Sequence, residues 1–253
     1  MSMFLLFFVI GALVGSFLNV CIYRLPLDQS IAYPASHCPH CKHKLNALDL
    51  FPLLSFLVLR GKCRYCQVAI PARYFMVELL TALLFGASSM VFVDTSKLFF
   101  SLYFIASLIV IFFIDWEHMV ISDWVVFPAI GMALFFQLLN GNVVMALLGA
   151  FVGGAVLFCI GFFGEKIYKK PAMGEGDYFL GILLGAFFGW QFCLLAIFLA
   201  FIIAFIFVLP FLLFKKLEIV DQIAFGPALA TSALVVLFFG QQILDWYWVL
   251  MVK

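Results

Sequence analysis

Two aspartates, Asp115 and Asp177, stand at the ends of long apolar segments, where a carboxylate is energetically expensive. Asp177 closes the sequence Gly174-Glu175-Gly176-Asp177, which has the form GxGD. Two carboxylates that share one proton can hydrolyse a peptide bond: one acts as a base toward a water molecule while the other polarises the scissile carbonyl. Asp115 and Asp177 are therefore predicted to be the catalytic pair of an aspartyl protease at a membrane edge.

The surroundings of the two aspartates suggest how their roles differ. Asp115 is expected to end a helix and Asp177 to precede one, so helix dipoles disfavour a charge on Asp115 and favour one on Asp177. The hypothesis is that Asp177 is the ionised partner. Gly174 and Gly176 suit a tight backbone that another segment can approach closely. Two other interpretations stay open: both aspartates are solvated helix caps without mutual contact, or they form an ion or proton pathway.

Four cysteines form a second candidate site. Cys38-x-x-Cys41 and Cys63-x-x-Cys66 are two CxxC pairs separated by 21 residues. Four thiolates at this spacing can hold a structural Zn²⁺ in tetrahedral geometry. A redox pair and unmetallated cysteines are the alternatives. The histidines near the first pair, His37, His40 and His43, are interpreted as loop residues, and the cysteines in apolar spans, Cys21, Cys159 and Cys193, as packing residues.

The composition defines the class of protein that must position these residues. Of its 253 residues, 67% are hydrophobic and 11% are charged, whereas roughly half the residues of a soluble domain are apolar. The chain is therefore an integral membrane protein. Its net charge of +1 gives no reason to expect a nucleic-acid partner.

The apolar segments predict an all-α polytopic fold with about eight transmembrane helices, since a helical span needs about 20 apolar residues. The first is expected to be a retained span rather than a cleaved signal, because no basic residue precedes it. The predicted spans are residues 4–23, 74–92, 98–114, 124–139, 143–163, 178–190, 193–214 and 227–249.

Basic residues predict the orientation of these spans. Three loops carry most of them: Arg24, Lys42, Lys44, Arg60, Lys62, Arg64 and Arg73 in the first, Lys166, Lys169 and Lys170 in another, and Lys215 and Lys216 in a third. With eight spans these loops share one side, and Lys97 and Lys253 fall on the other. The basic side is expected to be cytoplasmic. Asp115 and Asp177, 62 positions apart, then lie at the same cytoplasmic edge, and both termini lie outside.

Several motifs together resemble the bacterial prepilin peptidases, which are GxGD-type aspartyl proteases. The resemblance covers nearly the whole chain and rests on the opening sequence from Gly15 to Pro26, the cysteine loop with its flanks, and Phe225-Gly226-Pro227. In that family the catalytic aspartates lie in D-x-D-x-x-x-x-P-D and in GxGD. The first motif is similar to the segment 115–123, with Glu117 in place of its second aspartate and Ser122 in place of its proline.

The resemblance implies a substrate and a second activity. It implies that Asp115 and Asp177 cleave a short basic leader from type IV pilin-like precursors at the cytoplasmic side of a bacterial inner membrane. Such precursors belong to type IV pilus or type II secretion systems. It also implies N-methylation of the new N-terminus with S-adenosylmethionine, although no residue can be assigned to that cofactor. Gly174, Gly176, Glu117 and Asp123 would form the supporting catalytic loop.

The implied organisation has three parts: a first transmembrane helix at 1–23, a cytoplasmic zinc-binding domain at 24–73 and a transmembrane peptidase domain at 74–253. The lipid bilayer and the precursors are the expected partners, and the oligomeric state is left open. Three alternatives remain: another kind of intramembrane aspartyl protease, an ion- or proton-coupled transporter that uses the two aspartates, and an inactive scaffold of a pilus or secretion assembly.

Overall fold

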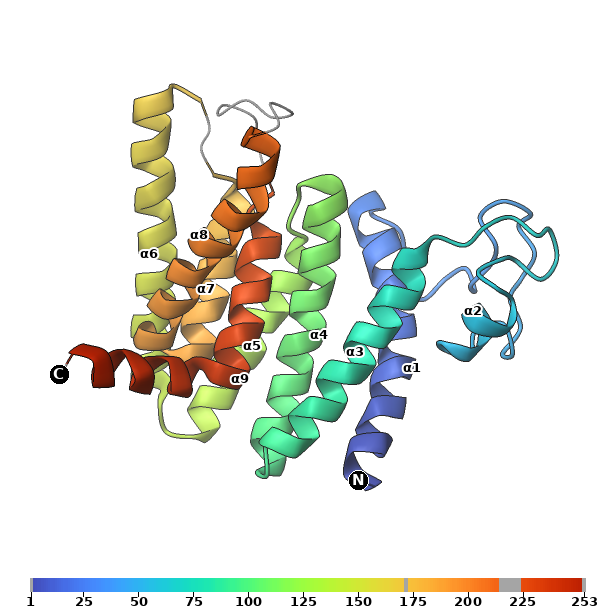
Figure 1. Cartoon of the computed structure of the whole chain (residues 1–253), viewed down its shortest axis with the longest axis horizontal. Coiled ribbons are helices and arrows are strands. Elements are labelled where there is room, and N and C mark those ends of the chain that lie inside the picture. Colours follow the sequence, from blue (N-terminus) through green and yellow to red (C-terminus); the bar gives the residue numbers. More distant parts are fainter. Residues whose placement is uncertain (1, 171–172, 214–223, 252–253) are drawn as a thin grey trace. The chain divides into compact units, whose positions relative to one another are not determined.

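The computed structural model describes residues 2–170, 173–213 and 224–251, and these residues form helices joined by loops (Figure 1). No β-strand occurs among them, and extended pairing is limited to two isolated bridges. The elements are α1 (Ser2–Arg24), η1 (Leu25–Leu27), α2 (Leu54–Val58), α3 (Ala72–Val91), α4 (Thr95–His118), α5 (Asp123–Leu139), α6 (Val143–Tyr168), α7 (Glu175–Phe188), α8 (Trp190–Leu213) and α9 (Gly226–Met251).

Each predicted span coincides with one helix, and the ends differ by a few residues. Among the described residues, six helices are long and apolar enough to cross a membrane: α1, α3, α4, α6, α8 and α9. The other two, α5 with 17 residues and α7 with 14, are shorter. The protein is thus an all-helical polytopic membrane protein. Phe214, Lys215, Lys216 and Lys253 lie outside the described residues.

The chain divides into two compact units, Met1–Val110 and Ile111–Lys253. In the first, α1 packs along α3 (Figure 1). Two glycines of α1 make this approach possible: a Cβ atom added to Gly11 would lie 2.8 Å from the Cα of Ala82, and one added to Gly15 would lie 2.8 Å from the Cα of Glu78. Small residues at this spacing let two helix backbones pack closely within a membrane. The cysteine loop leaves α1 and returns at α3.

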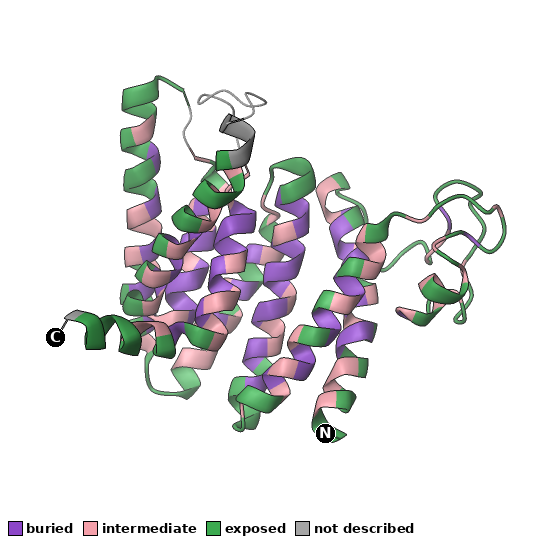
Figure 2. Cartoon of the chain, viewed as in Figure 1, coloured by how far each residue is buried: buried purple, intermediate pink, exposed green. Residues whose placement is uncertain are grey.

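In the second unit, α7 contacts α5, α6, α8 and α9. Its residues are mostly buried although the helix is short (Figure 2). Glycines again set the packing, because a Cβ atom on Gly181 would come within 2.7 Å of the carbonyl oxygen of Gly153 in α6. At the other end, the side-chain amide of Gln137 in α5 donates to the carbonyl oxygen of Phe187 at 2.7 Å. Neighbouring helices therefore hold α7 along its length, and with it the first turn that carries Asp177.

Candidate active site

Asp115 lies in the last turn of α4, three residues before the helix ends at His118. Its side chain is buried, with 5% of its surface exposed. The Oδ2 atom accepts a hydrogen bond of 2.9 Å from the backbone N–H of Gly226, the first residue of α9. The N-terminus of α9 thus supplies a donor to a carboxylate that lies 111 positions earlier in the chain.

Asp177 lies inside the first turn of α7 rather than before the helix, as the third helical residue after Gly174. It is also buried, with 8% of its surface exposed. Its Oδ2 atom accepts a hydrogen bond of 3.2 Å from the backbone N–H of Gly174. The carboxylate therefore closes the N-terminal turn of its own helix, where unpaired N–H groups favour an acceptor.

The two carboxylates lie close enough for their charges to interact, so the end of α4 and the start of α7 bring Asp115 and Asp177 into one site. The helix-dipole argument from the sequence considered only α4 for Asp115. The start of α9 also faces this carboxylate, so Asp115 lies between the C-terminal end of α4 and the N-terminal end of α9, whereas Asp177 lies at a helix N-terminus alone, and the dipole of α4 does not by itself decide which aspartate is ionised. The catalytic role of the pair stays a prediction.

Gly226 is the partner that sequence reasoning missed. A Cβ atom at this position would lie 2.5 Å from Asp115 Oδ2 and 3.0 Å from its Cγ, so no side chain fits between the start of α9 and the carboxylate. The signal was present in the sequence as Phe225-Gly226-Pro227, but nothing local to those residues indicates what they contact.

The four residues expected to support the catalytic loop separate into different environments. A Cβ atom on Gly176 would lie 2.7 Å from the Cβ of Ile121, in the turn between α4 and α5, so the backbones approach closely there. At Gly174 the nearest atom is 3.5 Å away, an ordinary contact. Glu117 and Asp123 are exposed. Only Gly176 is thus required to lack a side chain for steric reasons.

α6 extends beyond the level at which it contacts the first turn of α7. Tyr178, next to Asp177, packs against Gly161 and places its ring 5.6 Å from the ring of Phe158. From Gly161 the helix continues for seven residues to Tyr168. At 1.5 Å per residue, α6 extends about 10 Å past this contact.

The four cysteines converge in the loop of the first unit. Their Sγ atoms all lie within 4.8 Å of one another, and those of Cys38 and Cys66 are 3.8 Å apart. Zinc–sulfur bonds of about 2.3 Å in a tetrahedron place sulfur atoms about 3.8 Å apart, so the donor set fits a zinc ion. Backbone N–H groups also favour thiolate at one ligand: burial opposes ionisation, but the N–H groups of Cys41 and His40 lower the pKa of Cys38 to about 7.

Each cysteine pair lies in a turn of the same geometry. The N–H of Cys38 donates to the carbonyl of His43 at 3.0 Å, and that of Cys63 donates to the carbonyl of Val68 at 2.9 Å. The residue after each second cysteine, Lys42 or Gln67, has a φ of 59°. Isolated β-bridges close both turns. Local backbone geometry therefore places the sulfur atoms.

Asp49 connects the second cysteine turn to the residues that follow the first one. This structural role was not predicted from the sequence. Its carboxylate accepts from Arg64 Nε at 2.6 Å, from the Tyr65 hydroxyl at 3.0 Å and from the backbone N–H of Asn46 at 3.1 Å. Burial would raise the pKa of Asp49, but these donors hold it below its usual range. The ring of His43 packs on Tyr65 with centroids 3.6 Å apart, as expected for a loop residue.

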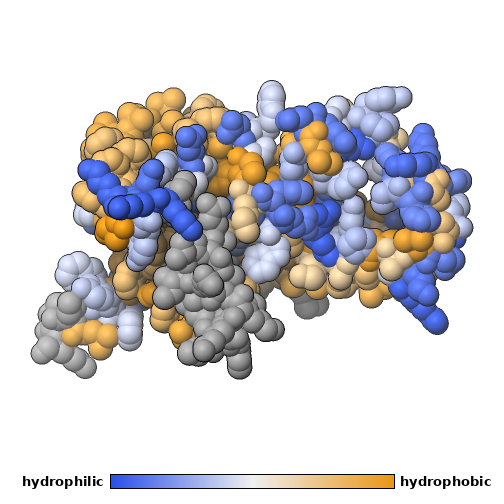
Figure 3. All heavy atoms as spheres, turned by 90° about the horizontal axis from the view of Figure 1, so that it is seen from above, coloured by the Kyte–Doolittle hydropathy of each residue, from blue (hydrophilic) through white to orange (hydrophobic). Residues whose placement is uncertain are grey.

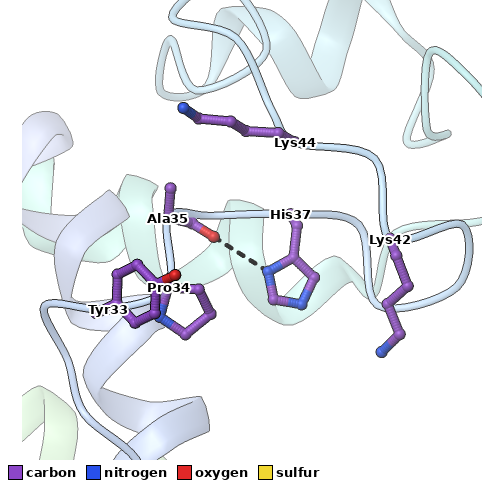
Figure 4. A pocket seen from close by; sticks show the side chains of 6 residues that line it. All are labelled: Tyr33, Pro34, Ala35, His37, Lys42 and Lys44. Carbon is purple, nitrogen blue, oxygen red and sulfur yellow. Dashed lines mark hydrogen bonds between the residues drawn. The ribbon is translucent and has the colours of Figure 1, made fainter.

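The cysteine loop also carries an open cavity of about 440 Å³. Hydrophilic side chains cover much of this part of the surface, at the right of the view, with apolar ones between them (Figure 3). Two lysines and a histidine contribute to the lining, where His37 Nδ1 lies 3.1 Å from the carbonyl oxygen of Ala35 (Figure 4). The lining residues are Tyr33, Pro34, Ala35, His37, Lys42 and Lys44. A cationic lining does not suit a basic leader peptide.

Two family models match the chain. Residues 9–92, from α1 to the end of α3, match the bacterial peptidase A24 N-terminal domain. Residues 102–209, which contain both aspartates, match the type IV leader peptidase family. The prepilin leader peptidase/N-methyltransferase of Aeromonas hydrophila is 34% identical over 270 residues, which cover 96% of this chain and 93% of that protein. The chain belongs to the type IV leader peptidase family.

Two further relatives of this chain carry the same name as the Aeromonas hydrophila protein. The protein from Pseudomonas aeruginosa is 33% identical over 94% of this chain and 91% of its own length. The protein from Myxococcus xanthus is 44% identical over 73% of this chain and 56% of its own length. No solved structure matches the chain significantly. The family resemblance seen in the sequence is confirmed.

Proposed function

We propose that this chain is a membrane-embedded aspartyl endopeptidase that removes the short basic leader from type IV prepilin-like precursors, with Asp115 and Asp177 as its catalytic residues. One observation carries the proposal: two buried carboxylates from α4 and α7, 62 positions apart, lie close enough to interact. The family and the names of the relatives support the activity. Neither the family nor the names of the relatives support an ion- or proton-coupled transporter.

The proposed reaction uses the two carboxyl groups as a pair with one shared proton. The ionised member takes a proton from a water molecule, whose oxygen attacks the scissile carbonyl carbon. The protonated member donates a hydrogen bond to the carbonyl oxygen as negative charge develops there. The tetrahedral intermediate then collapses, the C–N bond breaks and the leaving amine takes up the proton that the carboxylate had taken from the water. The N–H groups of Gly226 and Gly174 hold the two carboxylates in place.

We propose that the supporting loop consists of Gly174, Gly176, Glu117 and Asp123, with distinct tasks. The close approach of Gly176 to Ile121 fixes the start of α7 against the turn after α4. Glu117 and Asp123 are exposed acidic groups on either side of that turn, where they suit a basic leader through charge complementarity.

In the membrane, we propose eight spans, with α5 and the short α7 added to the six long apolar helices. This count supports a cytoplasmic position for the aspartates at the inner membrane of a bacterium, because the basic loops then share that side. The proposed parts are a first span at 1–23, a cytoplasmic domain at 24–73 and a peptidase domain at 74–253.

We also propose a structural zinc ion held by Cys38, Cys41, Cys63 and Cys66, which would stabilise the loop. Cluster geometry supports it, since four sulfur donors at these distances match a closed zinc site. The relatives are named as N-methyltransferases, which supports methylation of the new N-terminus with S-adenosylmethionine as methyl donor. We assign no residues to that cofactor.

Mass spectrometry of a pilin precursor co-expressed with the chain tests the proposal. The wild type should yield a shortened, methylated pilin, whereas Asp115→Asn and Asp177→Asn should each leave the precursor intact. Asp245→Asn is the control, because this exposed carboxylate of α9 accepts a hydrogen bond from Gln241 of its own helix and lies far along the chain from both aspartates. Shortened pilin from both of the first two variants would disprove the aspartate mechanism.

A further inference from the structure

The cysteine loop contains an apolar stretch that has no function in the proposed reaction or in metal binding. Residues 50–59 include one polar residue, Ser55, and no charged residue. Large apolar side chains in and near α2 are exposed: Phe51 by 52%, Leu54 by 56%, Leu57 by 58% and Val58 by 76%. Leu54, Leu57 and Val58 are spaced three and four residues apart within α2, which puts them on one side of this helical turn, and Phe51 precedes the turn. An apolar surface of this kind is typical of a contact with another molecule or a membrane.

Contacts with α3 fix the depth of this stretch within the first unit. The backbone N–H of Leu53 donates to Glu78 Oε2 at 2.8 Å, and the rings of Phe56 and Phe75 are 5.3 Å apart. Glu78 lies six residues after the start of α3 at Ala72, which corresponds to about 9 Å along the helix axis. The segment 50–59 therefore lies alongside the first turns of α3, not beyond its end. In Figure 1, α2 accordingly lies below the point where α3 begins.

This depth has a consequence, since α3 is one of the helices able to span the membrane. In a bilayer that α3 spans, side chains around its first two turns would lie near the boundary between headgroups and acyl chains. Backbone groups at that level need internal partners. The segment has them: Ser55 N–H donates to Phe51, Leu57 N–H to Leu53 and Leu59 N–H to Ser55, each to the carbonyl oxygen, and Glu78 accepts from Leu53 N–H.

Charge indicates which kind of membrane surface fits. Arg60 and Lys62 follow the apolar stretch directly, and both are exposed. No acidic residue occurs between residues 50 and 77. Apolar side chains flanked by cations are typical of segments that lie in the interface of a membrane with anionic lipids.

We propose that segment 50–59 is a membrane anchor of the cysteine loop. Phe51, Leu54, Leu57 and Val58 insert into the interface of the leaflet that α3 enters, and Arg60 and Lys62 bind anionic lipid headgroups. The buried carboxylate of Glu78 holds the segment at this depth through Leu53. The anchor is independent of the peptidase proposal, because it uses none of the aspartates or cysteines.

Photo-crosslinking to lipid tests the anchor directly. The full chain carries p-benzoylphenylalanine in place of Leu57 or, as a control, in place of Val68, an exposed apolar residue of the second cysteine turn. Both are reconstituted in nanodiscs of phosphatidylcholine with phosphatidylglycerol and measured by intact mass. We expect at least about fivefold more lipid adduct at position 57. Equal yields, or adducts at position 57 to a second copy of the chain instead of lipid, would overturn the proposal.

Two sets of variants test the charges, with the probe kept at position 57. Arg60→Gln with Lys62→Gln should lower the lipid adduct in anionic nanodiscs by up to about fivefold for each cation, and should change little in phosphatidylcholine alone. Glu78→Ala should reduce the adduct, while Glu78→Gln, which keeps an oxygen acceptor for Leu53 N–H, should restore it. An adduct yield that depends on neither lipid charge nor position 78 would contradict the assigned roles of these three residues.

Discussion

The cysteine cluster and the aspartate pair both join residues that are distant in sequence, but they do so by opposite means. The sulfur atoms are placed by two local turns of the same backbone geometry, with Asp49 between them. The carboxylates are placed by helix ends: Asp115 by the start of α9 and Asp177 by the start of α7. The cysteine cluster therefore depends on short-range hydrogen bonds. The aspartate pair depends on positions where helices pack without room for a side chain.

The largest effect is expected at Gly226, where the aspartate pair depends on another helix. Gly226→Ala would place a Cβ atom 2.5 Å from Asp115 Oδ2 and push the carboxylate aside. A displacement of about 1 Å can reduce the rate about 100-fold, so precursor cleavage should fall by that factor. Single-turnover cleavage rates measure this effect. Gly131→Ala is the matched control, because a Cβ atom there meets nothing within 4 Å; an equal loss in both would refute the steric account.

The two glycines of GxGD should differ in their tolerance of a side chain. Gly176→Ala brings a Cβ atom within 2.7 Å of Ile121, whereas Gly174→Ala meets only an ordinary contact at 3.5 Å. Overpacking costs about 1–3 kcal/mol, so we expect cleavage to drop about tenfold or more for Gly176→Ala. For Gly174→Ala it should stay within about twofold of the wild type, because its N–H still donates to Asp177. The reverse order would show that the motif serves backbone freedom rather than packing.

Loss of a cysteine should affect zinc binding far more than precursor cleavage. Cys63→Ser removes a buried sulfur donor, so the bound zinc measured by elemental analysis should disappear. The contacts that hold the carboxylates all lie within Ile111–Lys253, so precursor cleavage should fall by no more than about threefold. A complete loss of cleavage in a folded variant would show that the loop contributes to the peptidase site itself.

The smallest effect on cleavage is expected at Asp49. Asp49→Asn weakens the bond to Arg64, which costs about 1–3 kcal/mol for a hydrogen bond to a charged group, so zinc release to a chelator should accelerate at least about fivefold. Cleavage should not change. Asp28→Asn, an exposed carboxylate in the same loop, is the control and should release zinc at the wild-type rate.

The same contrast between local turns and distant helix ends explains how much of each site could be predicted from the sequence. The cysteine pairs were visible in the sequence because CxxC spacing is itself the structural unit, and the eight apolar runs coincide with helices because apolar length is local information. The hydrogen bond from Gly226 spans 111 positions, so spacing could not indicate it. For this reason the sequence-based prediction for Asp115 was incomplete, since it considered the dipole of one helix where two helices meet. α2 was missed because its five residues are too few to show a period.

The extension of α6 beyond the start of α7 has a consequence for any substrate. Since α6 continues about 10 Å past the level at which Tyr178 packs, a substrate that approaches Asp177 from that end passes beside this part of α6. In an intact helix the N–H and C=O groups of a peptide bond are paired within the helix, so the helix has to unwind locally before two carboxylates can act on one bond. A precursor whose leader joins its apolar helix through residues that resist helix formation therefore offers its scissile bond at lower free-energy cost, so selectivity arises partly from how readily that junction uncoils.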